Sequence, residues 1–207
     1  MSQSDHRVNA YQLRIVLRRT SPHIWRRVVV ESDSTVGQLH LTIQALFGWA
    51  DSHPQRFFLR GGTLDVSATA SVTSWPASVV LLSEFNLLAK EKFFYDYGFD
   101  HVNVPLWRHE IRFETALVED RKRLPHCIGG VGSPPLEQTS SPLELSNLTD
   151  LFTPQFVLTQ LTGLVDRGSS DAQLAQHMRH FRPWLTAERL SRKSANRCLD
   201  ASLGGAK

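Results

Sequence analysis

The N-terminal part of the chain alternates between apolar and polar positions with the period of a β-strand. Apolar side chains occupy every second position from Tyr11 to Leu17, and polar side chains hold most of the positions between them. Residues 24–30 are rich in β-branched side chains, and residues 20–23 are of turn-forming types. The pattern predicts a β-hairpin over residues 10–30.

The hydrophobic period then lengthens to that of an amphipathic helix. Thr35 and Gln38 have the spacing of a capping box, and Gly48 is placed to end the helix. The apolar residues that share one helical face are Val36, Leu39, Ile43, Leu46 and Phe47. We therefore predict strand, strand and helix over the first fifty residues, with the helix covering 35–49.

Strand patterns return in the middle of the chain. They are predicted near residues 56–60, 64–66, 92–97 and 107–117. The dipeptide Gly61-Gly62 supplies a hairpin turn between the first two. Residues 67–78 are small and polar and predict a loop, whereas 79–88 predict a short helix capped near Ser78.

Glycine and proline concentrate in residues 124–142, which predicts an irregular segment. The sequence after this segment is helical in pattern. Ser141-Pro142 and Thr153-Pro154 each combine a capping side chain with proline at the first helical position, so each predicts a helix start.

Two more helices are predicted towards the C-terminus. Asp171 is placed to cap the first of them, and Pro183 to interrupt it. Its predicted inward residues are Leu174, Ala175, Met178 and Phe181. Thr186 is placed to cap a last helix that extends to about Leu199.

These elements predict an α+β fold. An antiparallel or mixed sheet with a packed helix begins in ββαβ order, and a helical C-terminal region follows. We expect residues 10–141 to form the α+β domain and residues 142–200 to form a helical region packed on the same domain.

The composition narrows the class of protein. The chain has 207 residues, of which 41% are hydrophobic, so it can bury a sizeable core. No apolar run approaches the ~18–20 residues that span a bilayer, so we expect no membrane partner. The two cysteines, Cys127 and Cys198, cannot form a disulfide framework, and we expect a cytoplasmic location.

The small net charge of +3 hides an uneven distribution. Residues 1–50 and 151–207 are basic, whereas residues 51–150 are acidic, and 18 of the 23 basic residues are arginine. Arginine suits bidentate contacts with phosphate or carboxylate. The acidic middle can therefore pair with the basic ends within one molecule, or the arginines can bind an anionic partner.

Several short motifs follow one another in a distinctive order. They are Pro22-His23-Ile24-Trp25-Arg26-Arg27, Leu39-His40, Phe47-Gly48-Trp49 with His53, Tyr95-Asp96-Tyr97-Gly98, Trp107-Arg108-His109 and His126-Cys127-Ile128-Gly129-Gly130. From about residue 10 to 199 the chain resembles the plasmid pRiA4b ORF-3-like family, which is also labelled as transposon passenger proteins, TnpR. The motif residues are Trp25, Arg26, Arg27, His40, Trp49, His53, Asp96, Gly98, Trp107, His109 and Cys127.

The resemblance implies an α+β domain of mobile-element association without an assigned activity. The TnpR label implies a resolvase, but the chain lacks the nucleophile arrangement of such recombinases. Two segments depart from the family pattern. Eight residues, 99–106, are inserted between Gly98 and Trp107, and residues 134–141 lack the family's Asp, Cys and Gly pair, which weakens any site built there.

Some residues are of types that bind metals or catalyse reactions. They are His40, His53, Asp96, His109, His126 and Cys127. None belongs to a close ligand pair, so we expect no metal and no other cofactor. Asp96, His109 and Cys127 are the catalytic candidates, with Cys127 beside His126 as a nucleophile or, alternatively, as a small buried side chain.

The glycines at 129–132 lack the context of a phosphate-binding loop and read as a tight turn. The candidate nucleic-acid contacts crowd one hairpin: Arg14, Arg18, Arg19, Arg26 and Arg27. A two-stranded ribbon of this kind can enter a major groove. Arg26, however, shares strand parity with Ile24 and Val28, so it can instead lean inward towards Asp96 or Glu110.

Ten aromatic residues between 25 and 107 are expected in the core between sheet and helix. They are Trp25, Phe47, Trp49, Phe57, Phe58, Phe93, Phe94, Tyr95, Tyr97 and Trp107. We predict a non-enzymatic binding or accessory protein with an unknown ligand, for which DNA and a protein are the candidate partners. The alternatives are a nucleic-acid-binding protein that uses the arginine hairpin and a metal- or cysteine-dependent hydrolase.

Overall fold

A seven-stranded antiparallel sheet forms the centre of the structure, which is a computed structural model that describes residues 9–65, 79–99, 105–119, 123–185 and 191–203. The strands lie in the order β4-β3-β5-β6-β1-β2-β7. Their bounds are Ala10–Leu17 for β1, Ile24–Glu31 for β2, Gln55–Leu59 for β3, Gly62–Asp65 for β4, Lys92–Phe99 for β5, Pro105–Leu117 for β6 and His126–Val131 for β7. The predicted α+β class and ββαβ start are confirmed.

Both strands of the predicted hairpin lie inside this sheet and not at its edge. β1 pairs with β2 on one side and with β6 on the other, and β2 also pairs with β7. The hairpin is therefore no projecting ribbon, and the prediction that it could enter a major groove is wrong because each of its strands has a neighbour on both sides.

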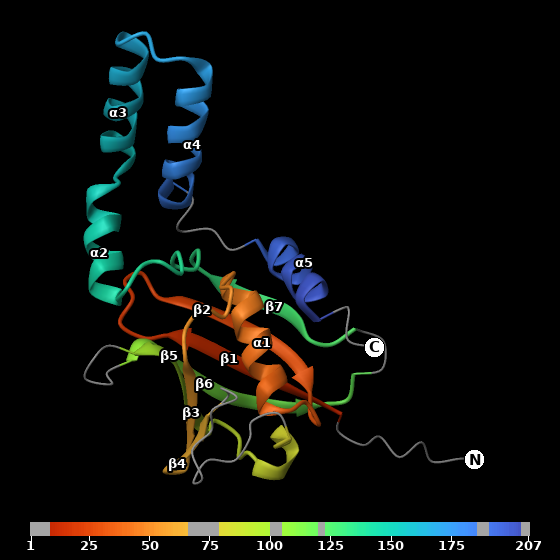
Figure 1. The fold of residues 1–207 in the computed structure, drawn as a ribbon. Coiled ribbons are helices and arrows are strands. Elements are labelled where there is room, and N and C mark those ends of the chain that lie inside the picture. Colours follow the sequence, from red (N-terminus) through yellow and green to blue (C-terminus); the bar gives the residue numbers. More distant parts are fainter. Residues whose placement is uncertain (1–8, 66–78, 100–104, 120–122, 186–190, 204–207) are drawn as a thin grey trace.

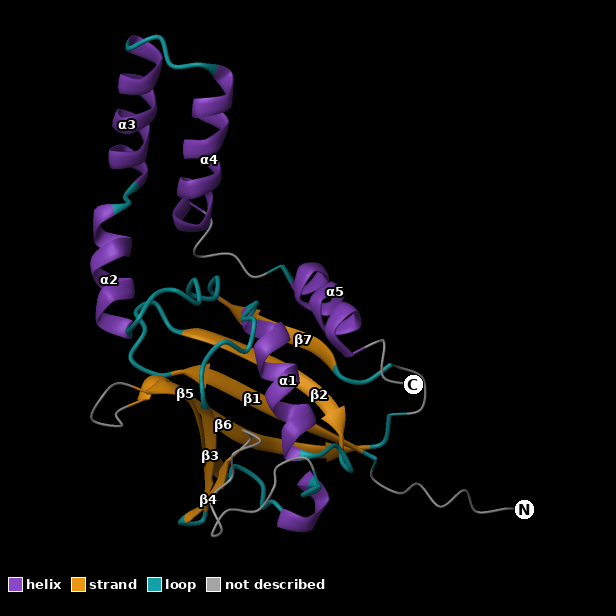
Figure 2. Cartoon of the chain, viewed as in Figure 1, coloured by secondary structure: helices purple, strands orange, loops and turns teal. Residues whose placement is uncertain are grey.

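Helix α1, Val36–Phe47, follows the hairpin as predicted. The Thr35 hydroxyl accepts from the Gln38 amide, the Gln38 side chain accepts from the Thr35 amide, and Gly48 ends the helix in the left-handed conformation. The apolar face of α1 packs on the sheet, and α5, Arg192–Leu203, lies over the same face (Figure 1). The opposite face of the sheet carries no described helix (Figure 2).

The segment between β6 and the helices is more regular than its glycines and prolines indicate. Residues 126–131 form β7, so the prediction of an irregular segment over 124–142 is wrong there. The pairing of β7 with β2 shifts its register between Arg27 and Val28, as at a β-bulge. The predicted short helix near 79–88 is a 3₁₀ turn at Leu82–Phe85, and its predicted cap, Ser78, lies outside the described residues.

Two of the three helices that follow begin where the proline signals place them. α2 is Pro142–Leu151 with Ser141 as cap, and α3 is Pro154–Asp166 with Thr153 as cap. α4 spans Asp171–Leu185. The side chain of Ser170, not Asp171, exchanges hydrogen bonds with Gln173 at its start, so the predicted cap is one residue too late.

Helix α4 differs from its prediction in two other ways. It continues through Pro183 to Leu185, so Pro183 does not interrupt it. Its inward residues are Leu174, His177 and Phe181, whereas Ala175 and Met178 are exposed. The last helix, α5, starts at Arg192 with Ser191 as cap, later than the predicted Thr186, which lies outside the described residues.

Helix α5 returns to the sheet after α2, α3 and α4 have led the chain away from it (Figure 1). Ala195 and Leu199 are buried against α1 and β7. The Asn196 side chain docks the helix to a strand, since its Oδ1 accepts from the Cys127 amide at 2.6 Å and its Nδ2 donates to the Cys127 carbonyl at 3.1 Å.

Replacing Asn196 by leucine should detach α5 from β7. The substitution leaves both backbone groups of Cys127 without their partner, which costs about 1–3 kcal/mol of unfolding free energy. Urea unfolding checks this value. The matched control is Lys193→Ala, one turn earlier on the exposed face of α5, and an equal loss in both variants would contradict the docking role.

Candidate functional site

The sheet separates the predicted site residues into two groups on opposite faces. His109 and Trp107 point towards α1, together with Tyr95, Tyr97 and Trp49. Asp96 lies between Tyr95 and Tyr97 on β5 and therefore points to the opposite face, with Arg108. Asp96 and His109 consequently do not share a cleft.

His109 is packed among aromatic rings beneath α1. Its ring centroid lies 4.7 Å from that of Phe47, 5.4 Å from that of Trp49 and 5.3 Å from that of Tyr95. The side chain is fully buried, and this burial lowers the pKa of His109 to about 3. The imidazole is therefore neutral at physiological pH and shielded from any substrate.

A polar network lies beside this ring cluster. The Tyr95 hydroxyl accepts from Gln44 Nε2 at 2.8 Å and is hydrogen-bonded to His40 Nδ1 at 2.8 Å. His40 Nε2 is 3.2 Å from a carboxylate oxygen of Asp51. Burial lowers the pKa of His40 although Asp51 opposes the shift, and burial raises the pKa of Tyr95. Both shifts favour the neutral forms of His40 and Tyr95, and these two side chains join α1 to β5.

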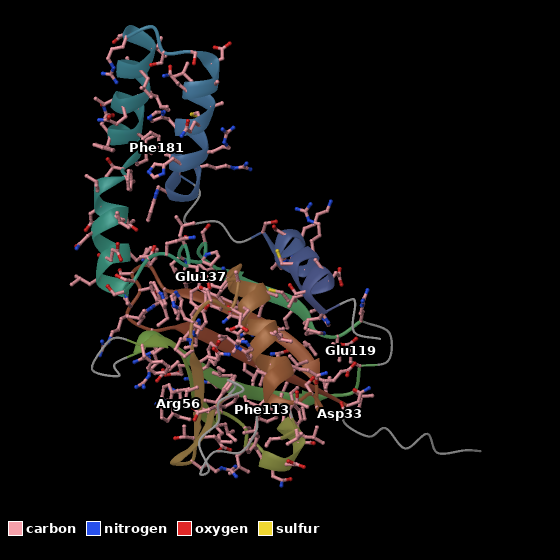
Figure 3. The ribbon with its side chains drawn as sticks, viewed as in Figure 1. Asp33, Arg56, Phe113, Glu119, Glu137 and Phe181 are labelled. Atoms are coloured by element: carbon pink, nitrogen blue, oxygen red, sulfur yellow. The ribbon has the colours of Figure 1, made fainter. Side chains whose placement is uncertain are left out.

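Glu137 joins the end of α1 to the segment after β7 (Figure 3). Its carboxylate accepts from the Tyr97 hydroxyl, the Ser52 hydroxyl and the amides of Ala50 and Ser52. Burial alone would raise the pKa of Glu137, but these hydrogen bonds outweigh it and lower the pKa to about 2. His53 packs against Tyr97 at 5.5 Å between ring centroids.

The segment 134–141, which departs from the family pattern, still makes structural contacts through its backbone. The indole of Trp49 donates to the Pro135 carbonyl, and that of Trp107 donates to the Thr139 carbonyl. Of the other departure, residues 99–106, the two described ends belong to paired strands, since Phe99 of β5 pairs with Pro105 of β6, and residues 100–104 lie outside the described residues. Gly98 before it has a φ of +68°, and a Cβ there would lie 2.9 Å from Leu106 Cδ1.

Arg26 is a core residue rather than a surface cation. Its side chain is fully buried and leans inward, as its strand parity predicts. The partners are not Asp96 or Glu110: the guanidinium donates to the carbonyls of Trp25, Val131 and Gly132 at 2.8–2.9 Å and lies over the Phe47 ring. Burial lowers the pKa of Arg26 to about 10, so the charge persists at neutral pH.

Cys127 lies on β7, under α5. Its thiol is buried, and the burial raises the pKa of the thiol, which disfavours the nucleophilic thiolate. The Sγ atom lies 3.4 Å from the Gly129 carbonyl oxygen. Within the described residues no three His, Cys, Asp or Glu side chains are grouped as a metal site would require.

The face of the sheet away from α1 and α5, here named the open face, carries a row of basic residues. Lys92 is opposite Arg112, Arg112 is opposite Arg14, and Arg14 is opposite Arg27. The row crosses four neighbouring strands, β5, β6, β1 and β2. Like charges directly opposite each other destabilise a sheet, so their concentration here needs anionic neighbours.

Carboxylates on the open face neutralise only part of this charge. Glu110 is shared among Lys92, Arg112 and Arg18, and Glu114 pairs with Arg27. The predicted pairing of the acidic middle with the basic N-terminus therefore occurs within the molecule. Arg14 has no such carboxylate, and its Nε makes no hydrogen bond to the described residues.

Aromatic side chains stand beside the basic row. Trp25 lies between two guanidinium groups, that of Arg14 at 4.7 Å and that of Arg27 at 5.5 Å from its ring. Phe58 and Phe94 are neighbours on β3 and β5, with Arg108 over both rings. The prediction that Trp25, Phe58 and Phe94 belong to the core beneath α1 is wrong, since strand alternation directs them to the open face.

A second basic group flanks the aromatic residues. Arg56 pairs with Asp65, and Arg108 pairs with Asp96 through two hydrogen bonds of 2.7 and 2.6 Å. Asp96 is thus a buried acceptor for an exposed arginine. Arg18 is half exposed on this face, and Arg19 is exposed in the turn that follows β1.

Sequence reasoning missed Lys92, Arg112, Arg56 and Arg108 as members of the same surface. The alternation of β6 does contain the signal, because Arg108, Glu110, Arg112 and Glu114 occupy every second position. What the sequence does not show is the strand order that places this series beside β1.

The burial of His109 should make stability fall in mild acid. The pKa of His109 is about 3 in the folded state and ~6.5 in the unfolded chain, so the unfolded state binds more protons between these values. Stability is complete above pH 6.5 and is lost as the pH falls towards 3, by about 2 kcal/mol at pH 5. Urea unfolding of His109→Phe should show a smaller loss between pH 7 and 5, whereas the exposed-residue control His180→Gln should match the parent protein.

Replacing Arg26 by methionine should destabilise the fold. The variant retains much of the side-chain volume but leaves buried carbonyls unpaired, so we expect a loss of about 3 kcal/mol in unfolding free energy. The matched control, Arg19→Asn, removes a turn arginine and keeps a residue type that tolerates its positive φ. A stable Arg26→Met variant would contradict the core role of Arg26.

Comparisons with known proteins agree with this architecture. A crystal structure of a protein of unknown function from Methanosarcina mazei Go1 has the same fold, with a TM-score of 0.62 and 23% identity over 70% of this chain and 81% of that chain. No curated protein matches the sequence. None of the described helices is long and apolar enough to cross a membrane. The sequence model of the plasmid pRiA4b ORF-3-like family matches residues 9–153, and the chain belongs to this family.

Proposed function

We propose that the protein is a non-enzymatic binding protein whose open face binds single-stranded nucleic acid. The observation that carries the proposal is the row Lys92, Arg112, Arg14 and Arg27, in which basic residues oppose one another across four strands. Phosphates placed along this row would relieve the repulsion between its charges. The family name links its members to a plasmid, which is compatible with a role close to nucleic acid in mobile elements.

The state of the catalytic candidates favours binding over catalysis. His109 and Cys127 are buried in forms unsuited to proton transfer or attack, and Asp96 is held by Arg108 on the other face. A crevice between α1, β3 and the 3₁₀ turn is lined by apolar side chains such as Leu39, Phe57 and Leu82, and none of the described residues that line it has a polar side chain to orient a substrate.

The geometry of the open face favours a single strand over a duplex. The arginines stand on the inner strands of a sheet, and this surface offers neither a projecting helix nor a ribbon that could enter a groove. Aromatic side chains adjoin the basic row, as they do in proteins that stack exposed bases. The ion pairs and cation–π contacts hold several guanidinium groups in place before a ligand binds.

The test is binding of a fluorescent oligothymidylate by anisotropy over a series of salt concentrations. The parent protein should bind at low salt, with an affinity that falls as salt rises. The double variant Arg14→Gln/Arg112→Gln should bind at least about tenfold more weakly and with a salt slope reduced by about 1.4, that is ~0.7 for each lost contact. Duplex DNA of the same length should bind more weakly than the single strand.

The control is Arg197→Gln, which removes a positive charge from the exposed side of α5. It should bind like the parent protein. Absence of binding by the parent at low salt would overturn the proposal, as would equal losses for the double variant and the control. A preference for the duplex would retain the basic row as the site but contradict the assignment to single strands.

A further inference from the structure

The hairpin of helices α3 and α4 stands away from the sheet and has little core of its own. The two helices lie side by side (Figure 1). Among the described side chains of α2, α3 and α4, only Val157 and Phe181 are buried (Figure 3 labels Phe181). Most helical stability in proteins comes from packing an apolar face, so this arrangement is short of buried surface.

The inward contacts of the hairpin follow the expected helical spacing. On α3 the buried or half-buried residues are Phe156, Val157, Leu161, Gly163 and Leu164, and on α4 they are Leu174, His177, Phe181 and Trp184. The Phe152 ring, just before α3, stacks on Trp184 and also contacts Phe156 and Phe181. These residues define the side on which the two helices face each other.

Four large apolar residues of the hairpin remain in solvent. They are Leu158 at 59%, Val165 at 59%, Met178 at 48% and Leu185 at 43% exposed, and we name them the hairpin stripe. The members on each helix are seven residues apart, which is the spacing of a helix-packing seam. Helix α3 has no charged residue before Asp166, so its outer surface lacks the charges usual on a solvated helix.

The hairpin stripe lies on one flank of the hairpin. Leu158 and Val165 each follow an inward residue of α3 by one position, and Met178 and Leu185 do the same on α4. One position turns a side chain by about 100° around a helix. Because the two helices are antiparallel, the same step turns the side chains of both towards the same flank.

We propose that the hairpin stripe packs against the hairpin stripe of a second copy of this chain, forming an antiparallel four-helix bundle. Two flat two-helix layers with matching stripes provide the self-complementary surface of a twofold dimer. This arrangement would supply the apolar neighbours that one hairpin lacks. It is independent of the open face, which lies on the sheet.

The charges favour a head-to-tail arrangement of the two copies. The tip of the hairpin carries two acidic residues, Asp166 and Asp171, and one basic residue, Arg167, whereas two basic residues, Arg179 and Arg182, lie nearer its base on α4. Head-to-tail packing brings the acidic tip of one copy towards the basic part of the other. It also places the two sheets at opposite ends of the bundle, where they do not collide.

Light scattering coupled to size exclusion tests the proposal on the full chain. The parent protein should elute as a dimer, and the double variant Leu158→Glu/Met178→Glu should be monomeric, with a dissociation constant at least about a hundredfold higher. Leu88→Glu is the matched control, since Leu88 is 70% exposed and lies before β5, away from the hairpin. It should remain dimeric.

A second measurement separates loss of dimer from loss of fold. Met178→Cys in a Cys198→Ser background should form an intermolecular disulfide on mild oxidation, because Met178 lies near the middle of the stripe and Cys127 is buried. A parent chain that is monomeric throughout the accessible concentration range would overturn the proposal. So would a dimer that survives the double variant, or a seam occupied by a different protein in place of a second copy.

Discussion

The buried guanidinium of Arg26 is the interaction on which the arrangement of the sheet depends. It originates on β2, donates to the carbonyls of Val131 and Gly132 at the end of β7 and lies over the Phe47 ring at the end of α1. A buried charge is costly unless its donors are satisfied. The position of β7 beside β2 and the position of α1 therefore both depend on the Arg26 side chain. If β7 moved, the guanidinium would lose its carbonyl acceptors, and if α1 moved, it would lose its contact with the Phe47 ring.

The rest of the inner face extends this constraint. Tyr95, Tyr97 and His109 fill the space between sheet and α1, and the hydroxyls of the two tyrosines are tied to Gln44 and Glu137. Polar groups that look catalytic in the sequence are here buried structural residues, and the Nε2 of His109 has no hydrogen-bond partner among the described residues. On the other face three cations share Glu110, and within the described part of the chain no ion pair joins Arg14 to a carboxylate. The charged side chains that a ligand could reach are thus concentrated on the open face.

Local sequence patterns predict most of the helices and strands, but they do not predict which strands pair with each other. The capping residues Thr35, Ser141 and Thr153 predict three helix starts, because a capping side chain bonds to a backbone amide within the first turn of its own helix. The glycines of 126–131 predict an irregular segment, whereas the segment is a strand that pairing with β2 stabilises. Parity placed Arg26 inward, but parity alone could not identify carbonyls far along the chain as its partners. The basic row needed the strand order, since its four members come from four strands.

Helix α5 lies far beyond the residues shared with the family, yet its Ala195 and Leu199 belong to the main core. The region of sequence similarity and the folding unit therefore have different boundaries. A truncation at residue 153 would retain every strand but uncover the apolar surface of α1 and β7 that α5 protects. Helices α2, α3 and α4, in contrast, connect β7 to α5, and we expect that the length of this connection can change without disturbing the sheet.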